Sequence, residues 1–296
     1  MTTRVKVLLA TSADLPHGEP GASVLDAVLA GRGIDVAWAR WDDPAVDWSA
    51  ASLVTVRSTW DYVTRHADFL AWAASLDQSR LLNGADVFAW NHDKRYLTEL
   101  GDLPVVPTLV ADDLAGLAMA VTHFGTAVVK PRVGAGGAGL IVVTDPADPR
   151  LGQPVRSHET YPSVGGPWVV QPLVESVHIT GEVSVYVIDG RLAARFDKLP
   201  GVGDVRVNEE FGGRVWQAGP DGLAEVGDLA MAAYDAMTAR FGRRMDYLRV
   251  DLLRWEGDWV VSELELIEPG LYLDVSTANA GPFADLLQAR LRAVDR

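Results

Sequence analysis

One hairpin near the end of the chain constrains the fold more than any other segment. It spans residues 247–268, where two apolar runs flank a turn centred on Gly257. With a three-residue loop at that turn, Asp251 stands directly opposite Glu263 on the neighbouring strand. Glu265 follows two residues later and therefore points to the same face as Glu263. The sequence predicts three carboxylates on one face of an antiparallel ribbon.

Like charges that face each other across strands are destabilising, so a cation is expected beside this face. Three oxygen ligands at this spacing suit Mg²⁺, which in turn holds phosphates. A solvated acidic strand face is the alternative, and a two-residue loop would break the direct pairing. The opposite face of the ribbon is apolar and is predicted to face the core; it consists of Val250, Leu252, Val260, Leu264 and Leu266.

A glycine-rich stretch between two apolar runs forms a second distinctive segment. It covers residues 126–143, where the first run ends in Lys130 and a strand-like run follows the glycines. Glycines let backbone amides approach and wrap an anion. A P-loop places its lysine after the glycines and continues into a helix, which is not the order here. The segment therefore predicts a flexible hairpin lid over phosphates, with a ligand-free glycine hairpin as the alternative. The lid glycines are Gly134, Gly136, Gly137 and Gly139.

Composition excludes several classes of protein. The chain has 296 residues, 48% of them hydrophobic, and no cysteine, so disulfides and thiolate metal sites are impossible. The formal charge of −14 argues against nucleic-acid binding, which needs a basic surface. No run approaches the length of a membrane span, and the first strand, expected from about residue 4, follows no long apolar segment. We therefore expect a cytoplasmic protein with no membrane partner.

The pattern of apolar runs divides the chain into three units. Residues 1–95 alternate strands and helices, which predicts a parallel α/β domain. Residues 96–175 form a smaller unit with the glycine lid, and the stretch 145–167 reads as a surface loop. Residues 176–296 combine antiparallel strands, a long helix at about 222–241 and a C-terminal amphipathic helix. The expected class is mixed α/β and α+β.

In this order, the motifs resemble the ATP-grasp superfamily, whose members hold ATP between two α+β units. The resemblance implies two phosphate lysines, Lys94 and Lys130, and a backbone hinge for adenine after the strand that contains WVVQ. It implies two Mg²⁺ ions, with Mn²⁺ as an alternative, held by Asp251, Glu263 and Glu265. The residues that it places at the adenine and ribose are Gln171, Leu173, Val174, Glu175 and Glu182.

The segment 198–213 resembles the part of these enzymes that carries a transition-state arginine. The resemblance assigns that role to Arg206 and a substrate or γ-phosphate contact to Lys198. A glycine-rich surface loop with solvated charges is the alternative.

Four further segments resemble a narrower family, the cycloserine synthetases, which close O-ureido-D-serine into D-cycloserine. They are RSTWDY, WDDPAVDW, WNHDK and ELELIEP. RSTWDY follows a strand at the carboxyl end, where open α/β sheets bind ligands. By this resemblance Arg57 pairs with a substrate carboxylate, Asp61 receives an amine, and Thr59 and Trp60 line the pocket. The alternative is a strand end with Trp60 packed between domains.

The resemblance implies an ATP-dependent ligase that activates a carboxylate as an acyl phosphate and then forms a C–N bond. The substrate is expected to be small and amino-acid-like, and the nucleophile to belong to the same molecule. An intermolecular peptide ligase, an ATP-grasp kinase and a non-catalytic ATP-binding module are the alternatives. A homodimer is compatible with this function.

Overall fold

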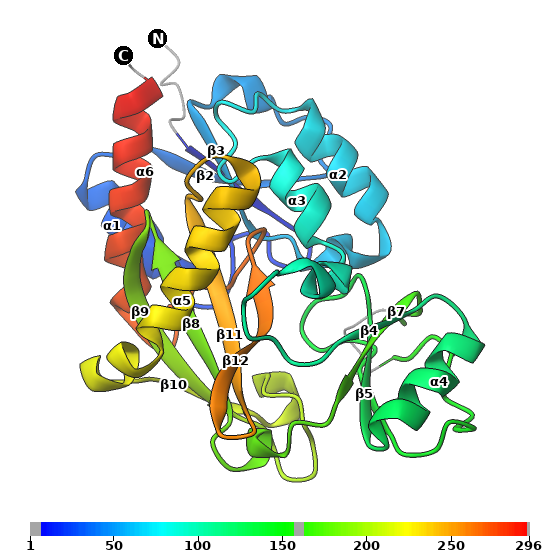
Figure 1. The fold of residues 1–296 in the computed structure, drawn as a ribbon. Helices are drawn as coiled ribbons and strands as arrows, with labels where there is room; N and C mark the ends of the chain where they lie inside the picture. The colour runs from blue at the N-terminus through cyan, green and yellow to red at the C-terminus, as the bar shows by residue number, and fades with distance from the viewer. Residues whose placement is uncertain (1–6, 157–162, 295–296) are drawn as a thin grey trace.

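The computed structural model describes residues 7–156 and 163–294, which form three sheets (Figure 1). The first sheet is parallel, in the order β2-β1-β3, as the alternating strand and helix signals of the N-terminal unit predict. Residues 4–6 of the expected first strand lie outside the described residues. Its elements are β1 (Val7–Thr11), α1 (Ala22–Gly31), β2 (Val36–Arg40), β3 (Leu53–Ser58), α2 (His66–Ser75) and α3 (Ala85–Asn91).

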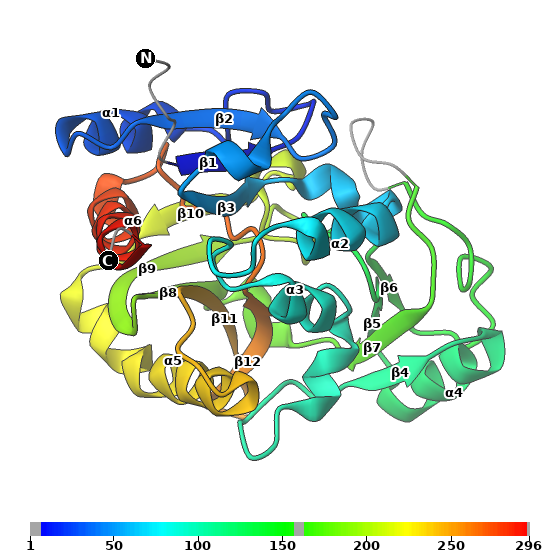
Figure 2. The same ribbon diagram turned by 90° about the horizontal axis from the view of Figure 1, so that it is seen from above.

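The small unit holds a four-stranded antiparallel sheet in the order β4-β7-β5-β6, covered on one face by α4. Figure 2 shows this unit at the edge of the molecule, away from α1. Val128 and Lys130 alternate with core residues on β5 and point away from α4 toward the third sheet. Part of the predicted surface loop, residues 157–162, lies outside the described residues. The elements are β4 (Leu109–Ala111), α4 (Leu114–Phe124), β5 (Ala127–Pro131), β6 (Ile141–Val143) and β7 (Trp168–Pro172).

The third sheet is antiparallel, in the order β10-β9-β8-β11-β12, and α5 covers one of its faces. The C-terminal helix α6 lies beside α1 of the N-terminal unit (Figure 1). Its predicted apolar face, which includes Phe283 and Leu287, is buried. The elements are β8 (Glu182–Ile188), β9 (Arg191–Leu199), β10 (Arg214–Gln217), α5 (Pro220–Phe241), β11 (Tyr247–Trp255), β12 (Asp258–Glu265) and α6 (Ala280–Val294).

The hairpin of β11 and β12 keeps the predicted pair Asp251–Glu263, but its loop length and register differ from the prediction. Trp255 pairs with Asp258, so the loop has two residues rather than three, and both have positive φ as tight hairpin turns require. A register shift after Asp251 then leaves Ser262 as an extra residue on β12. This bulge restores the pair Asp251–Glu263.

The same bulge corrects one predicted core position. Val260 pairs with Leu253 on the face of Asp251, and Val261 takes the core position opposite Leu252. A strand that gains one residue exchanges its faces beyond that point. Ser262 therefore lets one strand carry carboxylates and an apolar patch on the same side.

Two hydrophobic cores join the first and last units of the chain. One packs Val54 and Phe69 of the N-terminal unit with Val185 and Val250 of the third sheet. The other packs α1 and α6 around β1 and β8. The small unit has a separate core between α4 and its own sheet. No helix in residues 7–156 and 163–294 is long and apolar enough to cross a membrane.

Candidate active site

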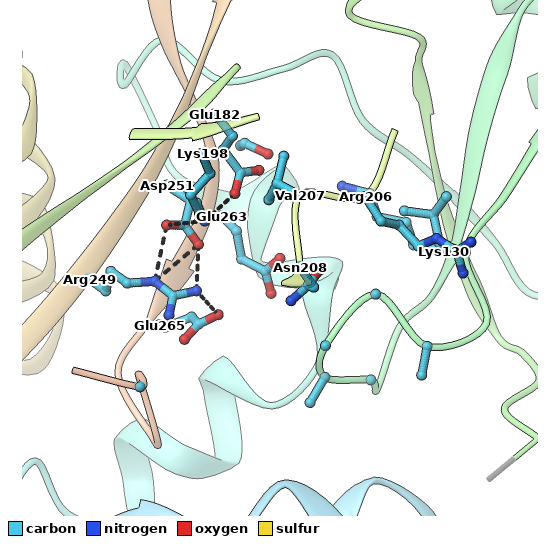
Figure 3. Close-up of a pocket in the computed structure, with 18 of the residues that line it drawn as sticks. Lys130, Glu182, Lys198, Arg206, Val207, Asn208, Arg249, Asp251, Glu263 and Glu265 are labelled. Carbon is cyan, nitrogen blue, oxygen red and sulfur yellow. Dashed lines mark hydrogen bonds and ion pairs between the residues drawn. The ribbon is translucent and has the colours of Figure 1, made fainter. Parts of the chain in front are cut away.

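A cavity of about 320 Å³ lies between the carboxylate face of the third sheet, the small unit and loops of the N-terminal unit. Its volume is in the range of small-molecule sites. Figure 3 shows the acidic cluster on one side and Lys130 on the other. The predicted site residues that line it are Trp60, Lys94, Lys130, Gly134, Gly136, Gly137, Gln171, Leu173, Val174, Glu182, Lys198, Arg206, Asp251, Glu263 and Glu265.

Asp251 is the most strongly paired carboxylate of the face. Arg249 donates to both of its oxygens, at 3.0 and 2.8 Å, and Ser184 Oγ donates at 2.5 Å. Lys198 Nζ lies 3.5 Å away. Burial acts to raise the pKa of Asp251, but Arg249 and Lys198 outweigh burial and lower it to about 2. Asp251 is therefore a fixed negative charge held by cations of the protein.

The other two carboxylates are more accessible and only partly balanced. Glu263 pairs with Lys94 at 2.9 Å, and Glu265 pairs with Arg249. Burial raises the pKa of Glu265 to about 8 although Arg249 lowers it, and Asp251 and Glu263 add to the increase. Glu265 is therefore mostly protonated at neutral pH, and a further cation beside it would favour its charged form.

The carboxylate face fits Mg²⁺ in its chemistry but not in its present arrangement. Within the described residues no three acidic or histidine side chains are grouped as a metal site. Asp251 and Glu265 share Arg249, whereas Glu263 turns to Lys94. Three carboxylates on one face are nevertheless the ligand set that a hard cation prefers. ATP-grasp enzymes depend on ATP and Mg²⁺, and these residues could hold the ion.

Two lysines reach the cavity from different segments. Lys94 Nζ donates to the Gly134 carbonyl at 2.7 Å, which ties it to the glycine lid. Lys130 is half-buried on β5, and burial lowers the pKa of its ammonium despite the carboxylates of Glu263 and Glu182. An anion in the cavity would stabilise the charged form of Lys130.

The loop before β10 packs against the glycine lid. Arg206 is held by Asp204 at 2.5 Å and stacks on Phe211, with 3.6 Å between its guanidinium carbon and the ring centre. A Cβ added at Gly137 would lie 3.1 Å from Arg206 Cδ, and the φ of Gly137 is +70°. The left-handed backbone conformation favours glycine there, and a side chain at this position would crowd Arg206. Arg206 is therefore a neighbour of the lid.

The strand β7 leads into the predicted adenine hinge. Gln171 is buried and donates to Thr108 Oγ1 at 2.9 Å. The Leu173 N–H donates to the Thr126 carbonyl at 3.0 Å, so this N–H is not available to adenine. The Val174 N–H donates no hydrogen bond to any of the described residues. Glu175 is exposed and lies outside the cavity lining, because the chain turns into a 3₁₀ helix there.

Lys198 and Glu182 form an ion pair on the cavity wall at 2.5 Å. Burial acts to lower the pKa of Lys198, but Asp251 and Glu182 outweigh burial and raise it. Lys198 is therefore charged and bridges the predicted ribose residue to the carboxylate face.

The structure corrects the predicted geometry of RSTWDY. Trp60 lines the cavity and its Nε1 donates to the Glu268 carbonyl at 3.1 Å, so it also packs between units. Arg57 and Thr59 are fully buried behind the cavity wall. Asp61 turns away to accept from Trp41 Nε1 at 3.0 Å and from Arg65 at 2.6 Å. Direct substrate contact by these three residues is not supported by their positions.

Four of the cavity-lining side chains that the sequence did not predict are Arg249, Tyr62, Glu268 and Glu19. Arg249 could have been found, because it stands two residues before Asp251 and so shares its face. Tyr62 lies in RSTWDY and Glu268 in ELELIEP, but the hydrogen bond between them joins segments that are far apart in sequence. Glu19 lies on a loop with no pattern of its own.

Comparisons with known proteins agree with this architecture. Residues 7–83 match the family described as D-cycloserine synthetase DcsG, N-terminal domain, and residues 93–219 match the prokaryotic glutathione synthetase ATP-grasp domain. The chain is 32% identical over 277 residues to the cycloserine biosynthesis protein DcsG of Streptomyces lavendulae, covering 88% of this chain and 90% of that protein.

Solved structures give the same result. The crystal structure of D-cycloserine synthetase DcsG superposes with a TM-score of 0.79 at 30% identity, covering 96% of this chain and 99% of that one. The ATP-grasp ligase PsnB shares the fold, with a TM-score of 0.62 at 17% identity, covering 97% and 98% of the two chains. The chain therefore belongs to the ATP-grasp ligases, in the family of the D-cycloserine synthetase DcsG.

Proposed function

We propose that this ligase closes a ring within a small amino acid, converting O-ureido-D-serine to D-cycloserine at the expense of ATP. One observation carries the proposal. The N-terminal unit that matches the D-cycloserine synthetase family also supplies Glu19, Trp60 and Tyr62 to the cavity. The similarity therefore extends to the part of the cavity that the N-terminal unit lines.

In this proposal, ATP lies between the small unit and the third sheet. Lys94 and Lys130 bind its phosphates, and the glycines at 134, 136 and 137 close over them. The Leu173 carbonyl and the Val174 N–H read the adenine edge, beside Gln171. Glu175 is retained only as a residue near the hinge. Glu182 binds the ribose, which requires it to share its carboxylate with Lys198.

Asp251, Glu263 and Glu265 are proposed to hold two Mg²⁺ ions, with Mn²⁺ as an alternative. The bound ions would neutralise phosphate charge as the γ-phosphoryl group moves to the substrate carboxylate. Arg249 keeps Asp251 ionised and correctly oriented. Arg206 and Lys198 are proposed to stabilise charge on the transferring phosphoryl group. Arg206 lies beside Gly137 of the glycine lid, so closure of the lid would bring it to this group.

The acyl phosphate must be shielded from water until the ring closes. The lid and Trp60 bound the cavity on two sides and exclude solvent when the lid is closed. Because the attacking nitrogen belongs to the same molecule, holding the substrate in a folded conformation supplies much of the rate.

The test is incubation with ATP, Mg²⁺ and O-ureido-D-serine alone. ADP, phosphate and D-cycloserine should form without a second amino acid, and the carbamoyl group of the substrate should leave as carbon dioxide and ammonia, with one water consumed. GTP should replace ATP poorly. Product that requires a second amino acid identifies an intermolecular ligase. A stable phosphorylated substrate identifies a kinase, and nucleotide binding without turnover of any amino acid identifies a binding module.

We place this activity in the cytoplasm, where ATP is available. A homodimer is compatible with it, because the cavity described above is formed within one chain. Light scattering measures the oligomeric state.

A further inference from the structure

A buried carboxylate at the N-terminal end of the cavity has one oxygen without a hydrogen bond. Glu19, on the loop between β1 and α1, lines the cavity and is 5% exposed. Its Oε1 accepts from Arg57 Nη2 at 2.7 Å and from the Leu271 N–H at 3.2 Å. Its Oε2 is buried and accepts nothing from the described residues. An unpaired buried acceptor is costly, so a donor supplied from the cavity would stabilise the site.

Arg57 fixes the orientation of this carboxylate. It is fully buried, donates to the Pro269 carbonyl at 2.8 Å, and lies 4.9 Å from the centre of the Phe283 ring. Two donors on Oε1 restrict rotation of the Glu19 carboxylate, so Oε2 keeps one position. This arrangement gives Arg57 a positioning role in place of the direct contact predicted from the sequence.

The charges at this end favour a cationic donor over a neutral one. Glu268 lines the same cavity, is 9% exposed, and forms a hydrogen bond with the neutral hydroxyl of Tyr62. Residues 268–271 connect the two acids, because Trp60 binds the Glu268 carbonyl and Glu19 binds the Leu271 N–H. Burial raises the pKa of Glu268 to about 7 although Tyr62, Lys94 and Arg249 lower it, so a further cation beside Glu268 would stabilise its charged form.

We propose that Glu19 Oε2 binds the α-ammonium group of the substrate and that Glu268 supplies the balancing charge. The proposal rests on the ligase function above and deepens it by assigning the residue that selects an α-amino substrate. The enzyme accepts carboxylic acids that carry an amine on the adjacent carbon. It discriminates against analogues with a hydroxyl group or hydrogen in that place, because they leave the negative charge unmatched.

The test compares Glu19→Gln with the wild type. Arg57 holds the side-chain oxygen of the glutamine, so the amide NH₂ replaces Oε2 and opposes an ammonium group. KM for O-ureido-D-serine should rise about tenfold to hundredfold, the effect of losing one charged hydrogen bond, with KM for ATP unchanged. Arg57→Lys should raise the same KM less. Glu225→Gln is the control, because that carboxylate also accepts from arginines but lies outside the cavity lining.

A second measurement separates this proposal from the proposed function. ADP release is measured for wild type and Glu19→Gln with small amino acids and with the matching 2-hydroxy and unsubstituted acids. The wild type should prefer the amino acids, and the preference should fall at least tenfold in the variant. If O-ureido-D-serine is inactive but this preference and its loss are found, the function is wrong and the subsite stands. An unchanged preference, or a change in thermal stability alone, would mean that water fills the site and would overturn the proposal.

Discussion

The two walls of the cavity belong to parts of the molecule that are built differently. The carboxylate wall lies on a sheet whose cores are shared between the first and last units, so Asp251 is backed by residues from both. Lys130 belongs to the small unit, whose core is its own. Backbone bonds such as Lys94 N–H to the Arg132 carbonyl, at 2.8 Å, connect the small unit to the body.

This difference separates a fixed surface from one that can move. Groups that hold metal must keep their mutual positions, and a shared core provides that rigidity. The glycine lid must open for nucleotide exchange, and the independent core of the small unit lets this unit move together with the lid. A small apolar cluster of Val63, Ala138 and Val164 joins the lid to the N-terminal unit, so lid position is linked to the substrate end.

The largest effect is expected on the fixed wall. Glu263→Gln should reduce turnover by about 10²–10³-fold or more, the scale of losing one preorganised charge at a reaction centre. Thermal stability without ligand should hold or rise, because fewer carboxylates repel one another. Asp228→Asn, on the exposed side of α5, is the control. Near-normal Mg²⁺-dependent turnover of Glu263→Gln would remove the metal assignment.

Core truncations compare the two parts directly. Phe283→Ala in the shared core should destabilise the protein by about 3–5 kcal/mol, and amide exchange should rise in both the first and third sheets. Leu117→Ala in the core of α4 should cost about 2–5 kcal/mol but raise exchange mainly in β4, β5 and β7. If Leu117→Ala speeds exchange equally in β1 and β11, the small unit is not independent.

The movable wall should contribute binding rather than stability. Lys130→Ala should weaken ATP binding by about 1.5–3 kcal/mol, the scale of a charge-assisted hydrogen bond. The melting temperature of Lys130→Ala without nucleotide should not fall, because burial disfavours the charged ammonium of Lys130 in the folded protein. Arg150→Ala, an exposed cation in the same unit, is the matched control for calorimetry. Equal ATP affinity in wild type and Lys130→Ala would contradict the phosphate role.

The smallest effect concerns pH. Burial raises the pKa of Glu265 to about 8 and that of Glu268 to about 7, both above their unfolded values near 4.3. Between about pH 5 and 8 the folded state therefore holds more protons than the unfolded state, so stability falls as pH rises. The melting temperature should drop by a few degrees across this window, and Mg²⁺ should restore part of it. Glu268→Gln should flatten the profile; a flat wild-type profile would contradict the raised pKa values of Glu265 and Glu268.

The sequence predicted the sheets because they follow from short-range periodicity. The pair Asp251–Glu263 was predicted with a three-residue loop, whereas the structure forms it with a two-residue loop and a bulge at Ser262. The long helix predicted at about 222–241 and the buried face of α6 follow from the same rule. The bulge at Ser262 was not predicted, because the residue types around it do not distinguish a bulged strand from a regular one. Arg57 was misplaced because whether a strand-end arginine faces a cavity depends on Glu19, Pro269 and Phe283, which come from other parts of the chain.

The bulge at Ser262 also determines where this hairpin tolerates a change in length. It divides the ribbon into two blocks of pairing, one next to the turn and one that carries Asp251, Glu263 and Glu265. Deleting Ser262 would exchange inward and outward residues in one block relative to the other, placing Glu263 or Val261 on the wrong side. A gap in an alignment of this region therefore changes the site if it falls at position 262. A one-residue deletion at the Glu256–Gly257 turn would alter only the block next to the turn, which carries none of Asp251, Glu263 and Glu265.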